Sequence, residues 1–226
     1  IAEGDKVCTE FLRHDKYHVE EAFILDGHEN EYLHLLKRLR IHVHSVNKAE
    51  MDQISQLKTP SGILLLLRRP DEGQKPDVSK GRTIYLDGIQ DPGNVGTIIR
   101  LADWFGVERV IRSEDSADFF NPKVVQASMG SMVNVDLHTF DLAGLDLVGL
   151  PVYGTYMTGE NVMEYNFSTP GILVLGNEGK GISETLSKLV TQRLTVPGSK
   201  DKVADSLNVA TAAGIIIAAW GRNYGI

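Results

Sequence analysis

The stretch that most constrains the fold is residues 83 to 106, TIYLDGIQDPGNVGTIIRLADWFG. Its first four residues form an apolar run typical of a buried strand, and Asp91-Pro92-Gly93-Asn94 is turn chemistry. Apolar residues then recur at helical spacing from Val95 to Phe105. A buried strand that leads through a turn into an amphipathic helix is the repeating unit of a parallel α/β sheet. Arg100 projects about 140° from Val95, outside the apolar stripe, so it is either solvated or functionally placed.

Further short apolar runs follow at intervals, separated by helical or irregular segments. This alternation predicts a mostly parallel sheet covered on both faces, and such sheets bind ligands at the carboxyl ends of their strands. The expected strands are Thr83–Leu86, Val107–Ile111, Asn134–Leu137, Val152–Tyr156, Ile172–Leu175 and Leu194–Val196.

The first 67 residues alternate more compactly and predict a small α/β domain. Residues 68–82, RRPDEGQKPDVSKGR, have linker composition, so we expect a division into 1–67, a linker 68–82 and a larger domain 83–226. The chain opens with a strand-like IAEG rather than Met, and native residues are expected to precede it. In the small domain we expect helices over Asp5–Leu12, Glu29–Leu39 and Ala49–Leu57 and strands over Ala22–Leu25, His42–Val46 and Ile63–Leu67.

A net charge of -7 argues against a protein that holds nucleic acid by bulk electrostatics, so any such contact must be local. No apolar run approaches the roughly 18 residues of a membrane span. The single cysteine, Cys8, excludes an internal disulfide, and together these features suggest a soluble cytoplasmic protein. His42 and His44 would share one strand face, but without a third ligand in pattern we expect no metal site.

Basic side chains gather in two segments, which are either a solvated surface and linker or a local RNA track. They are Lys37, Arg38 and Arg40 in the first and Arg68, Arg69, Lys75, Lys80 and Arg82 in the second.

Three strand exits in the second half are rich in glycine and polar residues: YGTYMTGEN, LGNEGKGIS and VPGSKDKVADSLNVA. Glycines let the backbone approach a ligand, although each segment alone could be an ordinary surface loop. The spacing G-x-x-G-x-G from Gly176 to Gly181 matches neither the dinucleotide fingerprint nor a P-loop, which disfavours a phosphate cradle.

Taken in order, LDGIQDPGNVGTIIRLADWFG, VLGNEGKGIS and VPGSKDKVADSLNVATAAGI resemble the three motifs of the SpoU family of RNA ribose 2′-O-methyltransferases, within the SPOUT superfamily. NPKVVQASMGSM between the first two is also similar to that family, and residues 1–67 resemble its small ribosomal-protein-like substrate-binding domain. The resemblance implies a sheet whose C-terminal part forms a trefoil knot, a homodimer through the knotted domain, and S-adenosylmethionine bound in the knot, without a metal.

The resemblance also implies site residues. Catalytic or substrate-orienting roles fall on Asn94, Arg100, Glu178, Ser206 and Asn208. The cofactor set is Thr155, Gly176, Asn177, Gly181, Val196, Pro197 and Leu207, with the backbones of Gly176, Val196 and Leu207 on the adenosine. Arginine stays protonated in proteins, so we expect Arg100 to position the hydroxyl and phosphate, with a role as base as the alternative.

Each of these residues has a structural alternative. Arg100 could pair with Asp103, Asn94 could cap its helix, and Glu178 could be a solvated turn residue. Asp205 or Ser206 could cap the last helix, expected over Leu207–Trp220.

That last helix is apolar on nearly all sides, which fits either core burial or a dimer interface that would also cover Trp104 and Trp220. The sequence departs from the family pattern at two places. Gly198 follows Pro197 where Met is common, and the segment from there to Ser206 is about two residues longer than in the family. Gln126 stands before ASMG where Arg is frequent.

The sequence therefore predicts an S-adenosylmethionine-dependent RNA 2′-O-ribose methyltransferase, with ribosomal RNA favoured over transfer RNA. One alternative is a non-catalytic RNA-binding protein of the same fold. A second, a Rossmann-type nicotinamide enzyme, is less favoured because the sequence has no G-x-G-x-x-G after the first strands of either domain.

Overall fold

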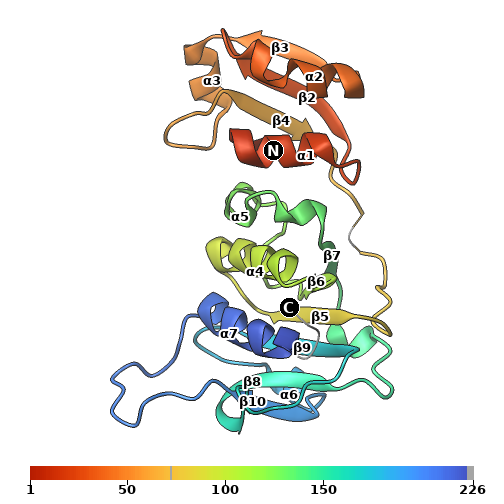
Figure 1. Cartoon of the computed structure of the whole chain (residues 1–226), viewed down its shortest axis with the longest axis vertical. Helices are drawn as coiled ribbons and strands as arrows, with labels where there is room; N and C mark the ends of the chain where they lie inside the picture. Colours follow the sequence, from red (N-terminus) through yellow and green to blue (C-terminus); the bar gives the residue numbers. More distant parts are fainter. Residues whose placement is uncertain (72, 223–226) are drawn as a thin grey trace.

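The computed structural model describes residues 1–71 and 73–222. Its two sheets lie at opposite ends of an elongated molecule, with helices between them (Figure 1). The small sheet is built from β1 (Ala2–Glu3), β2 (Val19–Leu25), β3 (His42–Val46) and β4 (Ile63–Leu67), with α1 (Asp5–Arg13), α2 (Glu29–Leu39) and α3 (Lys48–Ile54). The large sheet is built from β5 (Arg82–Asp87), β6 (Arg109–Arg112), β7 (Asp136–Thr139), β8 (Val152–Asn161), β9 (Gly171–Gly176) and β10 (Gln192–Thr195). Its helices are α4 (Pro92–Trp104), α5 (Pro122–Ser128), η1 (Ser131–Val133), η2 (Leu142–Gly144), α6 (Glu184–Ser187) and α7 (Val209–Gly221).

The small sheet has the order β1-β4-β2-β3, in which β2 and β3 are parallel and β4 is antiparallel to both of its neighbours. Leu12, Leu35 and Ile24 are buried in the same core, which joins α1 and α2 to one face of the sheet. On the other face, Met51 of α3 packs against Leu64.

The large sheet has the order β10-β8-β9-β5-β6-β7, and every neighbouring pair is parallel. One face carries α4, α5 and α7 in the main core, while α6 and η2 cover the other through a cluster around Tyr85, Ile111 and Val174. This confirms the predicted parallel sheet with helices on both faces. Because β8, β9 and β10 run side by side in one direction, the ends of these strands share one edge. The prediction that YGTYMTGEN is a strand exit was wrong, because β8 continues through this segment and pairs with β10 as far as Asn161.

Most predicted elements are present, and the boundaries that differ have local causes. The third helix ends at Ile54 rather than Leu57 because Ser55 adopts an extended backbone, and β7 begins at Asp136 rather than Asn134 because η1 occupies the preceding residues. The last strand ends at Thr195, so Val196 already belongs to the exit segment. Among the described residues, no helix is long and apolar enough to cross a membrane.

The last helix is buried largely within its own chain. Trp220 is fully buried, stacks on Phe167, meets Tyr153 edge to face, and donates its indole N–H to the Ser168 carbonyl at 3.1 Å. Of the two alternatives that the sequence left open, core burial accounts for Trp220, because the fold itself covers this ring. Trp104, by contrast, is 78% exposed.

Direct contacts join the two sheets in addition to the linker. Lys16, in the turn between α1 and β2, donates to the carbonyls of Met132 (3.2 Å) and Val135, and the hydroxyl of Tyr17 donates to Met132 at 3.3 Å. Burial lowers the pKa of Lys16, against the opposing attraction of Asp136. These contacts fix the small sheet to η1 and the start of β7.

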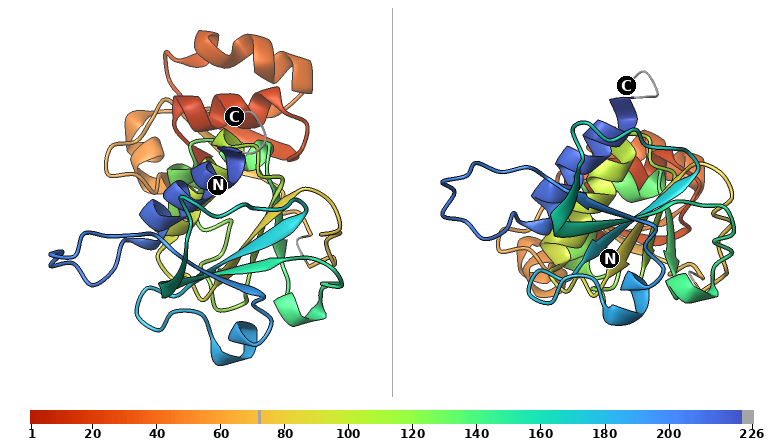
Figure 2. Two further views of the ribbon diagram at one scale, coloured as in Figure 1. Left: turned by 60° about the horizontal axis from the view of Figure 1, so that its bottom comes forward. Right: turned by 90° about the horizontal axis from the view of Figure 1, so that it is seen from below.

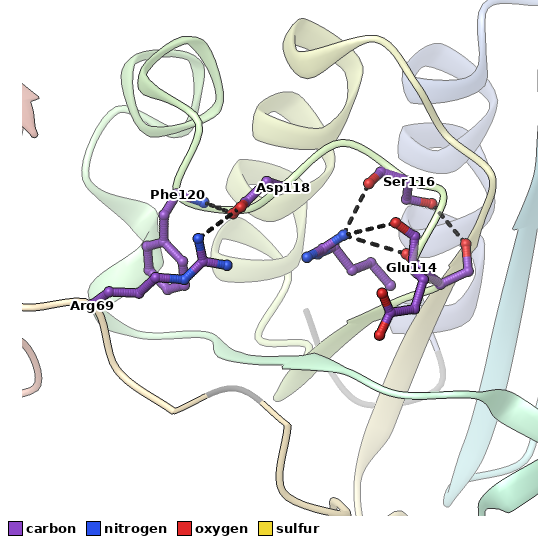
Figure 3. A network of polar contacts seen from close by, with 7 residues as sticks. Arg69, Glu114, Ser116, Asp118 and Phe120 are labelled. Atoms are coloured by element: carbon purple, nitrogen blue, oxygen red, sulfur yellow. Dashed lines mark hydrogen bonds and ion pairs between the residues drawn. The ribbon is translucent and has the colours of Figure 1, made fainter.

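The linker is itself held to the large-sheet half at its first residues (Figure 3). Arg69 donates to the carboxylate of Asp118 at 2.9 Å, and its guanidinium lies 5.3 Å from the ring centre of Phe120. The segment after β6 is held in turn by Arg112, which donates to the Ser116 carbonyl at 2.9 Å. The chain between the sheets is thus anchored where it leaves β4.

Candidate active site

Three predicted site residues, one from each motif, meet at the carboxyl edge of the large sheet. The side-chain amide of Asn94 donates to Glu178 Oε1 at 2.8 Å, and the amide of Asn208 donates to Asn94 Oδ1 at 2.9 Å. Asn94 lies in the first turn of α4, Glu178 follows β9, and Asn208 precedes α7. Segments up to 114 residues apart in sequence therefore form one chain of hydrogen bonds at the surface.

Asn94 does not cap its helix. Asp91 is the N-cap and accepts the Asn94 backbone N–H at 2.8 Å, with Pro92 at the first helical position. Proline favours that position because it has no N–H to leave unpaired, and this sets the helix start. The Asn94 side chain is consequently free to reach Glu178 and Asn208.

The cap of the last helix also differs from expectation. Asn208, rather than Asp205 or Ser206, accepts the backbone N–H groups of Ala210 and Thr211 at 3.0 and 3.2 Å. A side-chain oxygen that binds helix N–H groups fixes the rotamer of Asn208. Its amide nitrogen then points to Asn94.

The turn that carries Glu178 is rigid. Residues Asn177 and Gly181 exchange backbone hydrogen bonds, and the Asn177 side chain accepts the N–H groups of Gly179 and Lys180. Gly176 packs so closely on this turn that an added Cβ would lie 2.4 Å from the Gly181 carbonyl carbon. Glycine is therefore required at Gly176 by close backbone approach, and Gly181 has a left-handed φ of 70°.

The same turn is bound to the exit of β5. The Asn177 amide donates to the Gly88 carbonyl at 2.7 Å, and the nearly buried carboxylate of Asp87 accepts the Ser183 N–H at 2.6 Å. Asp87 lies opposite Gly176 in the sheet register. The sequence indicated Asn177 as a cofactor neighbour but did not indicate that its side chain joins the Glu178 turn to the exit of β5. It gave no indication of the role of Asp87.

Two residues of the predicted catalytic set are not in this hydrogen-bonded chain. Arg100 is exposed on α4 and, within the described parts of the chain, takes part neither in the alternative pair with Asp103 nor in another ion pair. Asp103 instead accepts the side-chain amide of Asn134 at 3.0 Å. Ser206 lies in the exposed segment between β10 and α7, which extends away from the body of the molecule (Figure 2, blue).

The cofactor residues predicted from the sequence border the same edge. Thr155 donates its hydroxyl to the Val174 carbonyl at 3.3 Å, Val196 is half-buried just after β10, and Leu207 is exposed beside Asn208. An added Cβ at Gly181 would meet no atom within 4 Å, so the turn backbone borders open space. These exits fit a flat ligand held by backbone groups, while Pro197 lies at the base of the extended segment.

A cavity of 530 Å³ lies between the two halves of the molecule and next to the first turn of α4. Leu57 contributes from the small-sheet half, and Pro92, Lys123 and Gln126 contribute from the other. The sequence marked Gln126 only as a departure from the family pattern. A cavity between domains depends on how they pack, which hydrophobic periodicity does not report.

The basic residues predicted to bind RNA are placed unevenly. The guanidinium of Arg38 donates to the Leu12 carbonyl at 3.0 Å, and that of Arg68 pairs with Glu20 at 2.9 Å. Lys37 and Arg40 are exposed. Arg82 is only 6% exposed and donates to the carbonyls of Phe105 and Gly106 at the end of α4, so its inclusion in an RNA track was wrong.

Across residues 1–71 and 73–222, no group of three or more His, Cys, Asp or Glu side chains is arranged to hold a metal ion. The imidazole Nε2 of His44 donates to the carboxylate of Glu21 at 3.0 Å, and the ring stacks on Phe23.

Comparison with known proteins connects this geometry to a family. Residues 81–218 match the model of the SpoU rRNA methylase family, and residues 1–72 match the RNA 2′-O ribose methyltransferase substrate-binding family. The chain is 31% identical over 182 residues to the 23S rRNA (guanosine(2553)-2′-O)-methyltransferase RlmP of Bacillus subtilis, with 78% of this chain and 71% of the relative covered.

Solved structures show the same fold over nearly the whole chain. A Porphyromonas gingivalis protein assigned to the TrmH family of RNA methyltransferases superposes with a TM-score of 0.84 at 36% identity, covering 98% of this chain and 88% of the other. The SpoU methyltransferase AviRb of Streptomyces viridochromogenes, in complex with AdoMet, superposes with a TM-score of 0.84 at 22% identity over 99% and 89% of the two chains.

Fold, site and matches together define an RNA-modifying methyltransferase. The match covers the three glycine-rich segments, the Asn94–Glu178–Asn208 chain and the small sheet alike. The chain belongs to the SpoU rRNA methylase family.

Proposed function

We propose that this protein transfers a methyl group from S-adenosylmethionine to the ribose 2′-hydroxyl of a nucleotide in structured ribosomal RNA. The observation that carries the proposal is the hydrogen-bonded chain from Asn208 through Asn94 to Glu178, because a binding module has no need to join these three motifs. Ribosomal RNA is favoured over transfer RNA by the substrate-binding match of residues 1–72 and by the 23S rRNA activity in the name of the Bacillus subtilis relative.

The cofactor is proposed to lie along the exits of β9 and β10 and the neighbouring part of β8 that carries Thr155. The backbones of Gly176, Val196 and Leu207 would hold its adenosine, with Thr155 and Gly181 at the border. S-adenosylmethionine would supply an electrophilic methyl carbon on sulfonium and leave as S-adenosylhomocysteine, so the protein needs to supply in-line positioning and an acceptor for the 2′-hydroxyl proton. AviRb, which shares the fold, has been solved with this cofactor bound.

The chain's own residues then position the RNA. Asn94 has both ends of its amide engaged, so its orientation is fixed, and the Glu178 carboxylate it contacts is an acceptor for a ribose hydroxyl at the same surface. Arg100 is exposed six residues further along α4 and is proposed to bind the phosphate or orient the hydroxyl. Ser206 would join them if the extended segment closes toward the edge. The 530 Å³ cavity beside Pro92 offers the approach for the target nucleotide.

A homodimer through the large-sheet domain is part of the proposal. Trp104, 78% exposed at the end of α4, is of a residue type enriched in protein interfaces, which supports the proposal. A trefoil knot in the segment from β9 to α7 and a cytoplasmic location are proposed from family membership. The domain division 1–67, 68–82 and 83–226 is likewise proposed, supported by the two sheets and by family matches over 1–72 and 81–218.

The experiment that tests this function compares unmodified ribosomal RNA with unmodified transfer RNA as acceptors of labelled methyl from S-adenosylmethionine. Incorporation into ribosomal RNA alone is expected. Incorporation into transfer RNA alone would overturn the substrate class. Cofactor binding measured by calorimetry separates the alternative, since a non-catalytic RNA-binding protein with a remodelled Gly198 segment would bind RNA and no cofactor.

A further inference from the structure

We propose that a second cavity, in the small-sheet half, binds an unpaired base of the RNA substrate and so fixes which nucleotide reaches the active site. The cavity has a volume of 220 Å³ and lies where α1 ends, β2 begins and the chain leaves α2. This inference rests on the proposed function, because it names a recognition site for the same substrate. The family match to residues 1–72 assigns substrate binding to this half but to no particular surface.

The lining has the chemistry of a base-binding site. Its walls are apolar, formed by Phe11, Tyr17 and Leu39, and the two rings meet edge to face with centres 5.2 Å apart. Its rim is polar, formed by the imidazoles of His14 and His18 and the carboxylate of Asp15. An unpaired base combines flat apolar faces with a hydrogen-bonding edge, and proteins recognise it by aromatic or imidazole stacking together with polar contacts to that edge.

The two basic segments of the sequence converge on this cavity, although 27 residues separate Arg40 from Arg68. Arg40 lies between the lining residues Leu39 and Ile41, and the Arg68 backbone N–H donates to the His18 carbonyl at 2.9 Å. The Arg68 side chain is 67% exposed in its pair with Glu20, and exposed ion pairs contribute at most about 1 kcal/mol. Its guanidinium can therefore exchange that partner for a phosphate, in a chain whose net charge of -7 otherwise repels RNA.

Tyr17 connects the cavity rigidly to the half that carries the active site. One side of its ring lines the cavity, its hydroxyl donates to Met132, and its ring lies 6.1 Å from that of Phe120. Phe120 in turn lies under Arg69, whose side chain is bound to Asp118 (Figure 3). A base held in the cavity would consequently stand at a fixed distance from Asn94 and Glu178, which is what selection of one nucleotide requires.

The test replaces both rim imidazoles, in His14→Ala/His18→Ala, and keeps the buried walls intact. The matched control is His34→Ala, an exposed histidine on α2 outside the cavity lining. Affinity for an unmodified 23S ribosomal RNA fragment is measured by fluorescence anisotropy at fixed salt, alongside KM, kcat and cofactor affinity. Loss of a stacked base predicts that Kd and KM for RNA rise about tenfold or more, with kcat and cofactor affinity changed less than twofold.

A second measurement does not depend on variants. Photocrosslinking of the wild-type protein to the same RNA carrying 5-bromouridine is expected to label the peptide containing residues 14–18. The proposal is overturned if the double variant binds RNA within twofold of His34→Ala, or if crosslinks fall only on the large-sheet half. Those outcomes, with normal methyl transfer by the wild type, would refute the cavity alone, whereas absence of transfer to any RNA would refute the proposed function.

Discussion

Replacing Gly176 by alanine should disable the active site, because the new methyl group would clash with the backbone of the turn that follows β9. The new Cβ would lie 2.4 Å from both the Gly181 carbonyl carbon and the Ile182 nitrogen, where ordinary contact begins at 3.4 Å, so the overlap is about 1 Å. Overpacking of this kind costs about 1–3 kcal/mol, which corresponds to a fall in Tm of about 2–12 °C for a chain of this size. The atoms that must move carry Asn177 and Glu178, and a displacement of about 1 Å at a catalytic group lowers the rate about 100-fold.

The same turn offers two matched controls. At Gly179 an added Cβ would meet only Asn177 Oδ1 at 3.6 Å, so Gly179→Ala should keep kcat/KM within about threefold. Gly181→Ala has open space but a φ of 70°, and the left-handed strain should cost about 1–2 kcal/mol of stability with a smaller loss of activity than Gly176→Ala. Thermal unfolding and methyl transfer to ribosomal RNA rank the three variants. Equal activity of Gly176→Ala and Gly179→Ala would refute the argument that this turn positions Glu178 by close packing.

Four further variants test separate contacts. Asn94→Asp replaces the amide 2.8 Å from Glu178 by a second carboxylate, and the repulsion between the two should lower kcat/KM at least about 100-fold. The control is Asn134→Asp beside Asp103, the same substitution in an amide–carboxylate pair outside the active site, which should leave activity unchanged. Lys16→Met leaves the carbonyls of Met132 and Val135 without their donor, so limited proteolysis of the 68–82 segment should accelerate. Lys58→Met, which replaces an exposed lysine, should not change the rate of cleavage. Equal rates in the two variants would show that the Lys16 hydrogen bonds do not hold the two halves together. Trp104→Glu should convert a dimer to monomers in light scattering, and a wild type that is already monomeric would contradict the proposed interface. Burial lowers the pKa of His138 below its ordinary 6.5, so the unfolded state binds more protons than the folded state as pH falls below about 6.5, and the free energy of unfolding drops. His138→Gln should flatten that part of the plot of unfolding free energy against pH. An unchanged plot would contradict the lowered pKa of His138.

The parallel sheet could be predicted because alternating apolar strands and helical segments leave direct marks in the sequence. The ligand edge, which was inferred from glycine-rich segments, stays a prediction. Two helix caps were predicted wrongly because Asp91 and Asn94, like Ser206 and Asn208, are all residue types that cap helices. Pro92 was the signal that could have decided the first case, since proline favours the first helical position and makes the preceding Asp91 the cap.

Other features depend on how distant segments pack. Arg82 reads as a linker charge in sequence but is buried, because the carbonyls at the end of α4 need a donor that only the fold brings there. Trp220 is covered by Phe167 and Tyr153, which lie 53 and 67 residues earlier in the chain. Both cavities likewise arise between segments that the sequence separates widely.

The measurement that tests the central claim most directly locates the methyl group. Ribosomal RNA is labelled by the wild type and by Arg100→Ala with S-adenosylmethionine, digested to nucleosides, and analysed by mass spectrometry. We expect a single 2′-O-methylated nucleoside from the wild type and a loss of at least about 100-fold in Arg100→Ala with cofactor affinity retained. A methyl group on a base, or undiminished ribose methylation by Arg100→Ala, would contradict the account.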